Sequence, residues 1–326
     1  MTEFNHIFQT IRDHLHGAAH VVIIAHQKPD GDALGSSLAL SHYLESIQKP
    51  HTCFCIDEVP FHLAFLPTSE KFTANTEHPA LQEADVICVL DSGDLSYAGI
   101  EQIIQSRIAN GKKLLIINID HHPTNTRYGN LNLVHEQASS TSEMIFHFLD
   151  AVRHPMTHET ATCLLTGILT DTGMFSNLAT TPSSLEAASR LMAYGAKIKD
   201  ITQHTVRNMS LVNLQLWGRA LSRLKENPET GVVTTVITRK DFDELGIASE
   251  QTEGIANFLN NLGHARMVMV LKEAEPGKIK ASLRTTHPDV DVSKFAQTFG
   301  GGGHKKAAGF TVDGKLKETT KGWEVV

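Results

Sequence analysis

The sequence lacks the features that mark secreted, membrane-spanning or polyanion-coating proteins. It has only four cysteines and no CxxC pair, and cysteines inside apolar runs are typical of buried free thiols in a reducing compartment. No apolar run approaches the roughly 20 residues that a membrane helix needs, and no basic stretch precedes an apolar one at the amino terminus. Acidic residues outnumber basic ones by 36 to 29, which argues against a general polyanion surface but not against a local anion site. We therefore expect a cytoplasmic protein without membrane contact.

The length predicts more than one domain. The 326 residues exceed the usual domain of about 150 residues, and a hydrophobic content of 41% leaves ample material for a core. A helical pattern over residues 197–226 separates two regions whose sequence patterns differ. We expect a first domain over residues 1–196, a helical linker over residues 197–226 and a smaller domain over residues 227–326.

The first region alternates between short apolar runs and helical patterns. Strand-like runs cover residues 21–25, 51–56, 84–90 and 113–119. Helical patterns cover residues 4–16, 32–47 and 99–109. This alternation indicates a doubly wound, mostly parallel sheet. The expected fold class is α/β, with such a sheet in the first domain and a smaller α/β domain after the linker.

Three of the expected strands stop at side chains that can hold a metal ion. These side chains are His26, Asp30 and Asp32 after the first strand, Asp91 after another, and Asp120 and His121 after a third. The carboxyl ends of parallel strands meet at one edge of a sheet, where ligands bind in open α/β folds. Mixed imidazole and carboxylate groups suit one or two divalent cations. Aspartates in turn and capping positions are the alternative for the first stretch, but the recurrence at three strand ends favours a metal site.

A run of four glycines forms the second unusual stretch. It ends at Gly303 and is followed by His304, Lys305 and Lys306. Glycines allow close backbone approach, so that their N–H groups can surround an anion, whereas a bare glycine run is usually only a turn. The adjacent histidine and lysines favour anion binding.

Two further residues have two interpretations each. Arg284, on an expected strand, could clamp a phosphate through its planar guanidinium or be a solvated strand residue. Asp171 lies where a helix is expected to end, so a cap and a metal ligand are equally consistent with its position. The sequence alone leaves both questions open.

Taken together, these motifs resemble those of the DHH phosphoesterase superfamily. The matching residues are His26-x-x-x-Asp30-x-Asp32, Asp91, Asp120-His121-His122 and Asp171. Residues 300–309 are similar to the DHH-associated carboxyl-terminal domain. The resemblance covers nearly the whole chain and is closest to the oligoribonucleases that also dephosphorylate 3′-phosphoadenosine 5′-phosphate (pAp).

The resemblance implies a hydrolase with two divalent metal ions, usually Mn²⁺. It implies that His26 and Asp30 hold one ion, that Asp32, His121 and Asp171 hold the other, and that Asp91 bridges them. It places Asp120 behind an imidazole and His122 at the phosphate, as a donor or proton-transfer group. For substrate binding it implies Arg284, Gly301, Gly302, Gly303 and His304.

The resemblance also implies the substrates, which are short RNA oligonucleotides and pAp. A linear or cyclic dinucleotide phosphodiesterase and an exopolyphosphatase or pyrophosphatase are alternatives within the superfamily. A nucleotide sensor that binds without cleaving is the non-enzymatic alternative, and the complete ligand set disfavours it. An exposed sheet edge in the first domain would permit a homodimer.

Overall fold

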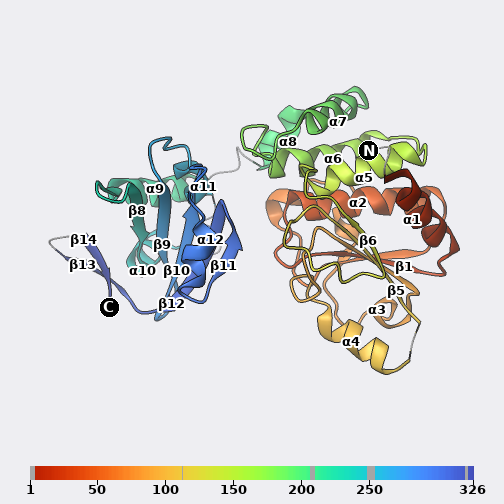
Figure 1. Ribbon diagram of the computed structural model, residues 1–326, viewed down its shortest axis with the longest axis horizontal. Helices are drawn as coiled ribbons and strands as arrows, with labels where there is room; N and C mark the ends of the chain where they lie inside the picture. Colours follow the sequence, from red (N-terminus) through yellow and green to blue (C-terminus); the bar gives the residue numbers. More distant parts are fainter. Residues whose placement is uncertain (1–3, 112, 206–209, 248–253, 320–321) are drawn as a thin grey trace. The chain divides into compact units, whose positions relative to one another are not determined.

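The computed structural model describes residues 4–111, 113–205, 210–247, 254–319 and 322–326. The chain separates into two compact units, Met1–Asn208 and Met209–Val326, which Figure 1 colours from red to green and from green to blue. Residues 206–209 of the expected helical linker lie outside the described residues. None of the described helices has both the length and the apolar character needed to cross a membrane.

A six-stranded sheet forms the centre of the first unit. Its order is β3–β2–β1–β4–β5–β6, and every neighbouring pair is parallel. The strands are β1 (Val21–Ala25), β2 (His51–Phe54), β3 (Phe72–Thr73), β4 (Val86–Leu90), β5 (Leu115–Asp120) and β6 (Leu131–Val134). The sheet confirms the predicted doubly wound arrangement. Strands β3 and β6 were not expected, because runs of two and four residues carry little periodic pattern.

Helices cover both faces of this sheet. They are α1 (Asn5–Gly17), α2 (Gly31–Ser46), α3 (Ala80–Glu83), α4 (Glu101–Ala109), α5 (Thr141–Ala151), α6 (His158–Asp171), α7 (Pro182–Ala193) and α8 (Ile198–Thr205), with 3₁₀ turns η2 (Phe61–Leu63) and η3 (Ser69–Lys71). Side chains alternate across strand β1, so that Val21 and Ile23 join the core under α1, α2, α5 and α6, while Val22 and Ile24 join the core under α3 and α4. Figure 1 shows these two helical layers.

Helices α2 and α6 pack together through positions without side chains. A Cβ atom at Gly35 would lie 2.3 Å from the carbonyl oxygen of Cys163, and one at Gly31 would lie 2.5 Å from Oγ1 of Thr170. Both distances are too short for real atoms, so glycine is what permits this approach. The approach brings Asp32, near the start of α2, close to Asp171, the last residue of α6.

The second unit contains another six-stranded sheet, of order β11–β12–β10–β9–β8–β7. Strands β8 and β9 are parallel, and the other neighbouring pairs are antiparallel. The strands are β7 (Lys225–Asn227), β8 (Val232–Ile237), β9 (Met267–Glu275), β10 (Lys278–Arg284), β11 (Gly302–His304) and β12 (Ala307–Asp313), and β13 (Leu316–Thr319) pairs with β14 (Gly322–Val325) in a separate ribbon. The helices are α9 (Leu211–Ser222), α10 (Arg239–Leu245), α11 (Ile255–Leu259) and α12 (Val292–Gln297).

Two segments differ from the sequence expectation. Strand β7 begins at Lys225, inside the stretch expected to be helical, because its backbone pairs with β8. The end of the glycine run is not a free loop, since Gly302–His304 forms strand β11 and pairs with β12. Glycines give no alternating side-chain pattern, so this pairing could not be seen in the sequence.

Candidate metal centre

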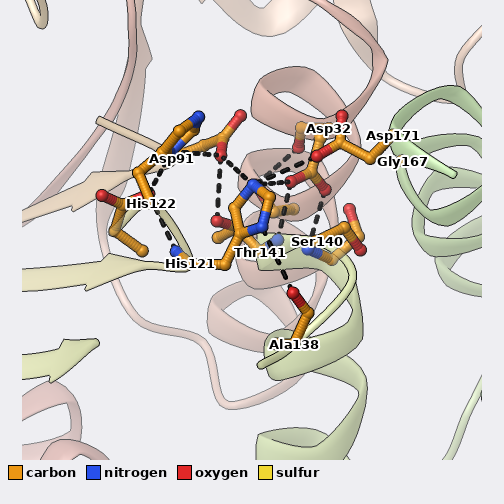
Figure 2. Close-up of polar contacts among 12 residues, drawn as sticks. Asp32, Asp91, His121, His122, Ala138, Ser140, Thr141, Gly167 and Asp171 are labelled. Carbon is orange, nitrogen blue, oxygen red and sulfur yellow. Dashed lines mark hydrogen bonds and ion pairs between the residues drawn. The ribbon is translucent and has the colours of Figure 1, made fainter. Parts of the chain in front are cut away.

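The polar residues at the three strand ends lie together at the carboxyl edge of the first sheet. The Nε2 atom of His26, after β1, lies 3.5 Å from Oδ2 of Asp91, after β4. The Nε2 atom of His121, after β5, lies 3.5 Å from Oδ1 of the same aspartate and 3.1 Å from Oδ2 of Asp171 (Figure 2). Asp91 therefore lies between two imidazoles and presents one carboxylate oxygen to each.

Three sets of residues bring potential ligand atoms within 4.8 Å of one another. The sets are His26 with Asp30 and Asp91, Asp32 with His121 and Asp171, and Asp91 with His121 and His122. The first two sets together contain all six residues expected from the sequence to hold metal ions. The geometry therefore brings every expected ligand into one cluster, within the first unit.

Both imidazoles turn the same ring nitrogen toward the carboxylates. Nδ1 of His26 lies 2.7 Å from the carbonyl oxygen of Gln27, and Nδ1 of His121 lies 3.4 Å from that of Ala138. A carbonyl only accepts, so Nδ1 donates and, in the neutral ring, Nε2 keeps its lone pair for a cation. The ring of His26 is also stacked on Tyr97, with centroids 4.8 Å apart.

Asp30 combines capping with a place in the cluster. It is the N-cap of helix α2, and its Oδ1 accepts hydrogen bonds from the backbone N–H groups of Asp32 and Ala33 at 2.9 and 3.0 Å. The same oxygen lies 3.9 Å from Nε2 of His26. The capping interpretation is thus correct for Asp30, and it fixes the carboxylate where the cluster needs it.

Asp32 is held by the first turn of another helix. Its Oδ2 and Oδ1 accept from the backbone N–H groups of Thr141 and Ser142, at 2.6 and 2.8 Å, at the start of α5. The Thr141 hydroxyl donates to Oδ1 of Asp91 at 3.0 Å. A helix N-terminus favours negative charge, so α5 stabilises both buried carboxylates. From the sequence, these hydroxyl residues could bind substrate or cap a helix, and their contacts with the aspartates were missed.

Asp91 has an unusual backbone conformation. Its φ is +58°, in the left-handed region that asparagine and aspartate tolerate better than most residues. Its backbone N–H donates to the carbonyl oxygen of Ile119 on β5 at 3.0 Å. The chain therefore turns sharply at the end of β4 with Asp91 tied to the neighbouring strand.

The carboxylates of the cluster strongly affect one another. Desolvation within the cluster and the negative charge of Asp91 raise the pKa values of Asp30, Asp32 and Asp171, although the side chain of Asp30 is itself 55% exposed. Burial acts in the same direction on Asp91, but contact with His26 and the charges of the histidines hold its pKa below the usual range. The four crowded carboxylates carry more negative charge than the three nearby imidazoles can balance.

The donor set fits divalent cations. Nε2 of His121 is buried and, among the described residues, has no hydrogen-bond partner, although oxygens of Asp32, Asp91 and Asp171 lie within 4.0 Å. Separations of 3 to 4 Å are those of ligands placed about 2.0–2.3 Å from a shared ion. Imidazole combined with carboxylate favours a transition metal over Ca²⁺ or Mg²⁺.

Asp120 lies behind this cluster and contacts His122. It is fully buried, and its Oδ1 accepts from Nδ1 of His122 at 2.7 Å and from the backbone N–H of His121 at 2.9 Å. Its Oδ2 accepts from Nδ2 of Asn125 at 2.6 Å. Asn125 was not singled out in the sequence, where it reads as an ordinary polar residue of the loop after β5.

The remaining expected site residues lie together in the second unit. Arg284, the last residue of β10, is opposite Ala307 of β12, and Ala307 is in turn opposite His304 of β11. A Cβ atom at Gly301 would lie 2.2 Å from the carbonyl oxygen of Gly309, and one at Gly303 would lie 2.6 Å from that of Ala307. The glycines thus allow close packing of this edge, and Gly302 has open space where a Cβ would be.

The charge of Arg284 is not balanced by a carboxylate. Its Nε donates to Oδ1 of Asn257 at 2.7 Å and its Nη1 to the carbonyl oxygen of Leu283 at 2.9 Å. In the part of the chain that the structure describes, no carboxylate oxygen lies within 4.0 Å of it. Desolvation lowers its pKa. A partly desolvated guanidinium without a counter-ion is suited to a bound anion.

Comparison with known proteins agrees with this geometry. Residues 20–168 match the DHH family, N-terminal domain, and residues 220–321 match the DHHA1 domain. A bifunctional oligoribonuclease and PAP phosphatase NrnA of Thermus thermophilus is 31% identical over 294 residues, which are 90% of this chain and 84% of that protein. The chain belongs to the DHH family. It is therefore a phosphoesterase, and DHH phosphoesterases depend on divalent metal ions.

Two further relatives of this DHH protein cover most of its length. The protein of the same name from Bacillus subtilis is 27% identical over 296 residues, which are 90% of this chain and 89% of that protein. The crystal structure of an exopolyphosphatase-related protein from Bacteroides fragilis has a TM-score of 0.86 and 27% identity, and it covers 94% of this chain and 90% of that one. The resemblance seen in the motifs is confirmed at the level of the family.

Proposed function

We propose that this chain hydrolyses short RNA oligonucleotides to mononucleotides and pAp to AMP, with two divalent metal ions, Mn²⁺ as the expected metal. The observation that carries the proposal is the position of Asp91 between His26 and His121, with a different oxygen 3.5 Å from each imidazole. A carboxylate that faces two ligand groups in this way is suited to bridge two ions. The names of the relatives from T. thermophilus and B. subtilis support the two substrates.

The proposed ligands divide into two groups around Asp91. His26 and Asp30 hold one ion, and Asp32, His121 and Asp171 hold the other. Bound there, divalent ions supply Lewis-acid charge for the phosphoryl oxygens and lower the pKa of an attacking water. The protein's own contribution is to fix the carboxylates beforehand, through the α2 cap and the first turn of α5.

His122 acts at the substrate in this proposal. Its Nδ1 faces Asp120, and Nε2 of the protonated ring is the nitrogen that donates to a phosphoryl oxygen or transfers a proton. Asp120 keeps the ring in that orientation and, as an anion, stabilises its protonated form. In these roles Asp91, Asp120 and His122 are the catalytic group.

The second unit binds the substrate's terminal phosphate or nucleotide in this proposal. Arg284 supplies a positive charge that no carboxylate among the described residues contacts. The backbone of Gly301, Gly302 and Gly303, with His304, forms the adjacent edge. Phosphate recognition by a guanidinium and by glycine N–H groups needs no particular base, which suits a range of short oligonucleotides.

A short polyphosphate is the second candidate substrate, because the solved B. fragilis structure is named as exopolyphosphatase-related.

A cytoplasmic location is proposed from the four cysteines, all of them free and buried. A homodimer is proposed through β6, which forms one edge of the first sheet; analytical ultracentrifugation measures it directly.

A rate assay with Mn²⁺ tests the proposal. The panel holds pAp, RNAs of two to five nucleotides, pyrophosphate, a short polyphosphate, a cyclic dinucleotide and a long single strand. We expect the highest kcat/KM on pAp and the shortest RNAs, and elemental analysis should find two ions per chain. Preference for polyphosphate, pyrophosphate or the long strand would overturn the substrates, and a protein that binds fewer than two ions would overturn the bridging role of Asp91.

A further inference from the structure

The side-chain amide of Asn125 connects the loop after β5 to the catalytic group. Its Nδ2 lies 2.6 Å from Oδ2 of Asp120 and 3.1 Å from the carbonyl oxygen of Ser92. Its Oδ1 accepts from Nδ2 of Asn118 at 2.9 Å and from the backbone N–H of Arg127 at 2.7 Å. The amide thus joins the ends of β4 and β5 at the place where both carry site residues.

The backbone fixes which way round this amide lies. The N–H of Arg127 can only donate, so the atom facing it must be the amide oxygen, and the nitrogen must face Asp120. Arg127 has a φ of +55°, an uncommon conformation for a residue with a side chain. The loop therefore takes an unfavourable turn at Arg127 while its N–H is bonded to Asn125.

The fixed amide gives the two oxygens of Asp120 different hydrogen-bond partners. Oδ2 is occupied by Asn125, so Oδ1 is the oxygen that receives Nδ1 of His122, at 2.7 Å. Because a carboxylate can only accept, the proton in this hydrogen bond lies on Nδ1 of His122. Without the amide, Oδ2 would be a buried acceptor without its donor, and the carboxylate would be held through Oδ1 alone.

We propose that Asn125 is a positioning residue that acts through Asp120 to keep a proton on Nδ1 of His122 and to fix the orientation of its ring. The role of Nε2 at the phosphate rests on the proposed function, whereas the ring form does not. A partner that orients a functional imidazole is worth roughly 10- to 100-fold in activity when it is removed. The amide thus completes an Asn–Asp–His series across one loop.

Asn125→Asp is the direct test, because it keeps the size and the acceptor for Arg127 and removes the amide donor shared by Asp120, Ser92 and Asn118. In the metal-free protein, ¹⁵N chemical shifts of the His122 ring should show Nδ1–H in the wild type and a loss of that form in the variant. In the Mn²⁺ enzyme kcat should fall roughly 10- to 100-fold while KM stays within about twofold. An unchanged ring form would overturn the proposal.

Two further variants separate positioning from a structural effect. In a His122→Ala background, Asn125→Asp should cost little more, because residues that act in series are not additive. Exchange of the pair, Asp120→Asn with Asn125→Asp, restores a donor–acceptor contact between positions 120 and 125 and still offers an oxygen to Nδ1, so it should recover the Nδ1–H form of the ring, although not the rate, because the anion at position 120 is lost. Equal losses with and without His122, or no recovery of the ring form in the exchanged pair, would overturn the proposal.

A failed substrate assignment would be distinguishable from a failed inference. If the wild type turned over neither pAp nor short RNA, the ¹⁵N measurement would still report the ring form without any substrate. If Asn125→Asp lowers the midpoint of thermal unfolding by more than a few degrees, the ring form of His122 is measured in Asn125→Ala and in the exchanged pair instead.

Discussion

Gly167, in the middle of helix α6, leaves the space that the carboxylate of Asp32 occupies. A Cβ atom at Gly167 would lie 2.6 Å from Oδ1 of Asp32 and 2.0 Å from Oγ of Ser142. Both neighbours are completely buried, and both belong to the contact that holds Asp32 at the start of α5. Glycine at this position therefore leaves room for the proposed metal centre; Figure 2 labels Gly167 near Asp171 and Asp32.

Gly167→Ala should displace Asp32 and weaken metal binding. The added methyl group has no room to enter, so α5 or α6 must shift, at a cost of about 1–3 kcal/mol in the free energy of unfolding. We expect Mn²⁺ affinity, measured by calorimetry, to fall at least about tenfold. Gly218→Ala in α9, where no atom lies within 4 Å of the new Cβ, is the matched control and should stabilise the protein. Unchanged Mn²⁺ affinity would contradict the role given to Gly167.

Asp91→Asn should give a folded protein without turnover. Asparagine tolerates the positive φ at this position but provides no charge for two ions, so kcat should fall by about 10²- to 10³-fold or more. Asp91→Ala should be equally inactive and less stable than Asp91→Asn by about 1 kcal/mol, because alanine is strained in the left-handed region. Thermal unfolding and the pAp assay measure both effects, and an active Asp91→Asn protein would exclude the bridging role.

Glu143 should make the first unit sensitive to acid. It is buried in the first turn of α5, where it accepts from the backbone N–H of Ser139 at 2.7 Å and lies 3.6 Å from Nε2 of His147. Burial opposes ionisation, but contacts with His147, Ser183 and Ser139 lower its pKa to about 2. A lowered folded-state pKa stabilises the protein above the unfolded-state value near 4.5, and this contribution disappears as the pH falls from about 4.5 to about 2.

Denaturant unfolding of the metal-free protein between pH 6 and pH 3 measures this effect. The pKa difference corresponds to about 3 kcal/mol at neutral pH. Glu143→Gln should remove that part of the pH dependence, so the two stability curves should converge as the pH falls. Parallel curves would show that Glu143 titrates alike in the folded and unfolded chains.

Arg284→Gln should weaken substrate capture and leave the chemical step nearly intact. Charge-assisted hydrogen bonds contribute about 1.5–3 kcal/mol, so KM for pAp should rise roughly 10- to 100-fold. The KM of Arg284→Lys should lie between those of the wild type and Arg284→Gln, since lysine keeps the charge without the planar guanidinium. Lys280→Gln, at an exposed position of the same strand, is the control. A large loss of kcat at unchanged KM would contradict the binding role.

The strands and the residues at their ends could be predicted because short buried strands leave a plain pattern. The run over Val21–Ala25 is entirely apolar and is followed by His26 and a turn, and strand β1 has these same bounds. Parallel strands then bring such ends to one edge without any further information. The contacts of His26 with Asp91, and of Asp91 with His121, follow from that topology.

The supporting contacts could not be predicted, because they depend on how helices pack in three dimensions. The series Ser139–Ser142 indicates a helix start, but nothing in it specifies that the N–H of Thr141 meets Asp32, 109 positions away. In the sequence, Gly167 is a residue of low helix propensity within an apolar helix. The close approach of Asp32 in the structure gives the reason for a glycine at this position. Asn125 likewise gains its meaning from Asp120 and Arg127.

The proposed cleaving residues all lie in the first unit, whereas Arg284 and the glycine-rich strand lie in the second. Each unit has its own sheet and its own core. Under the proposed function, choice of substrate and cleavage of the bond would be altered by changes in different parts of the gene. Exchange of the second unit between relatives would then yield enzymes that keep one reaction and accept new phosphate esters.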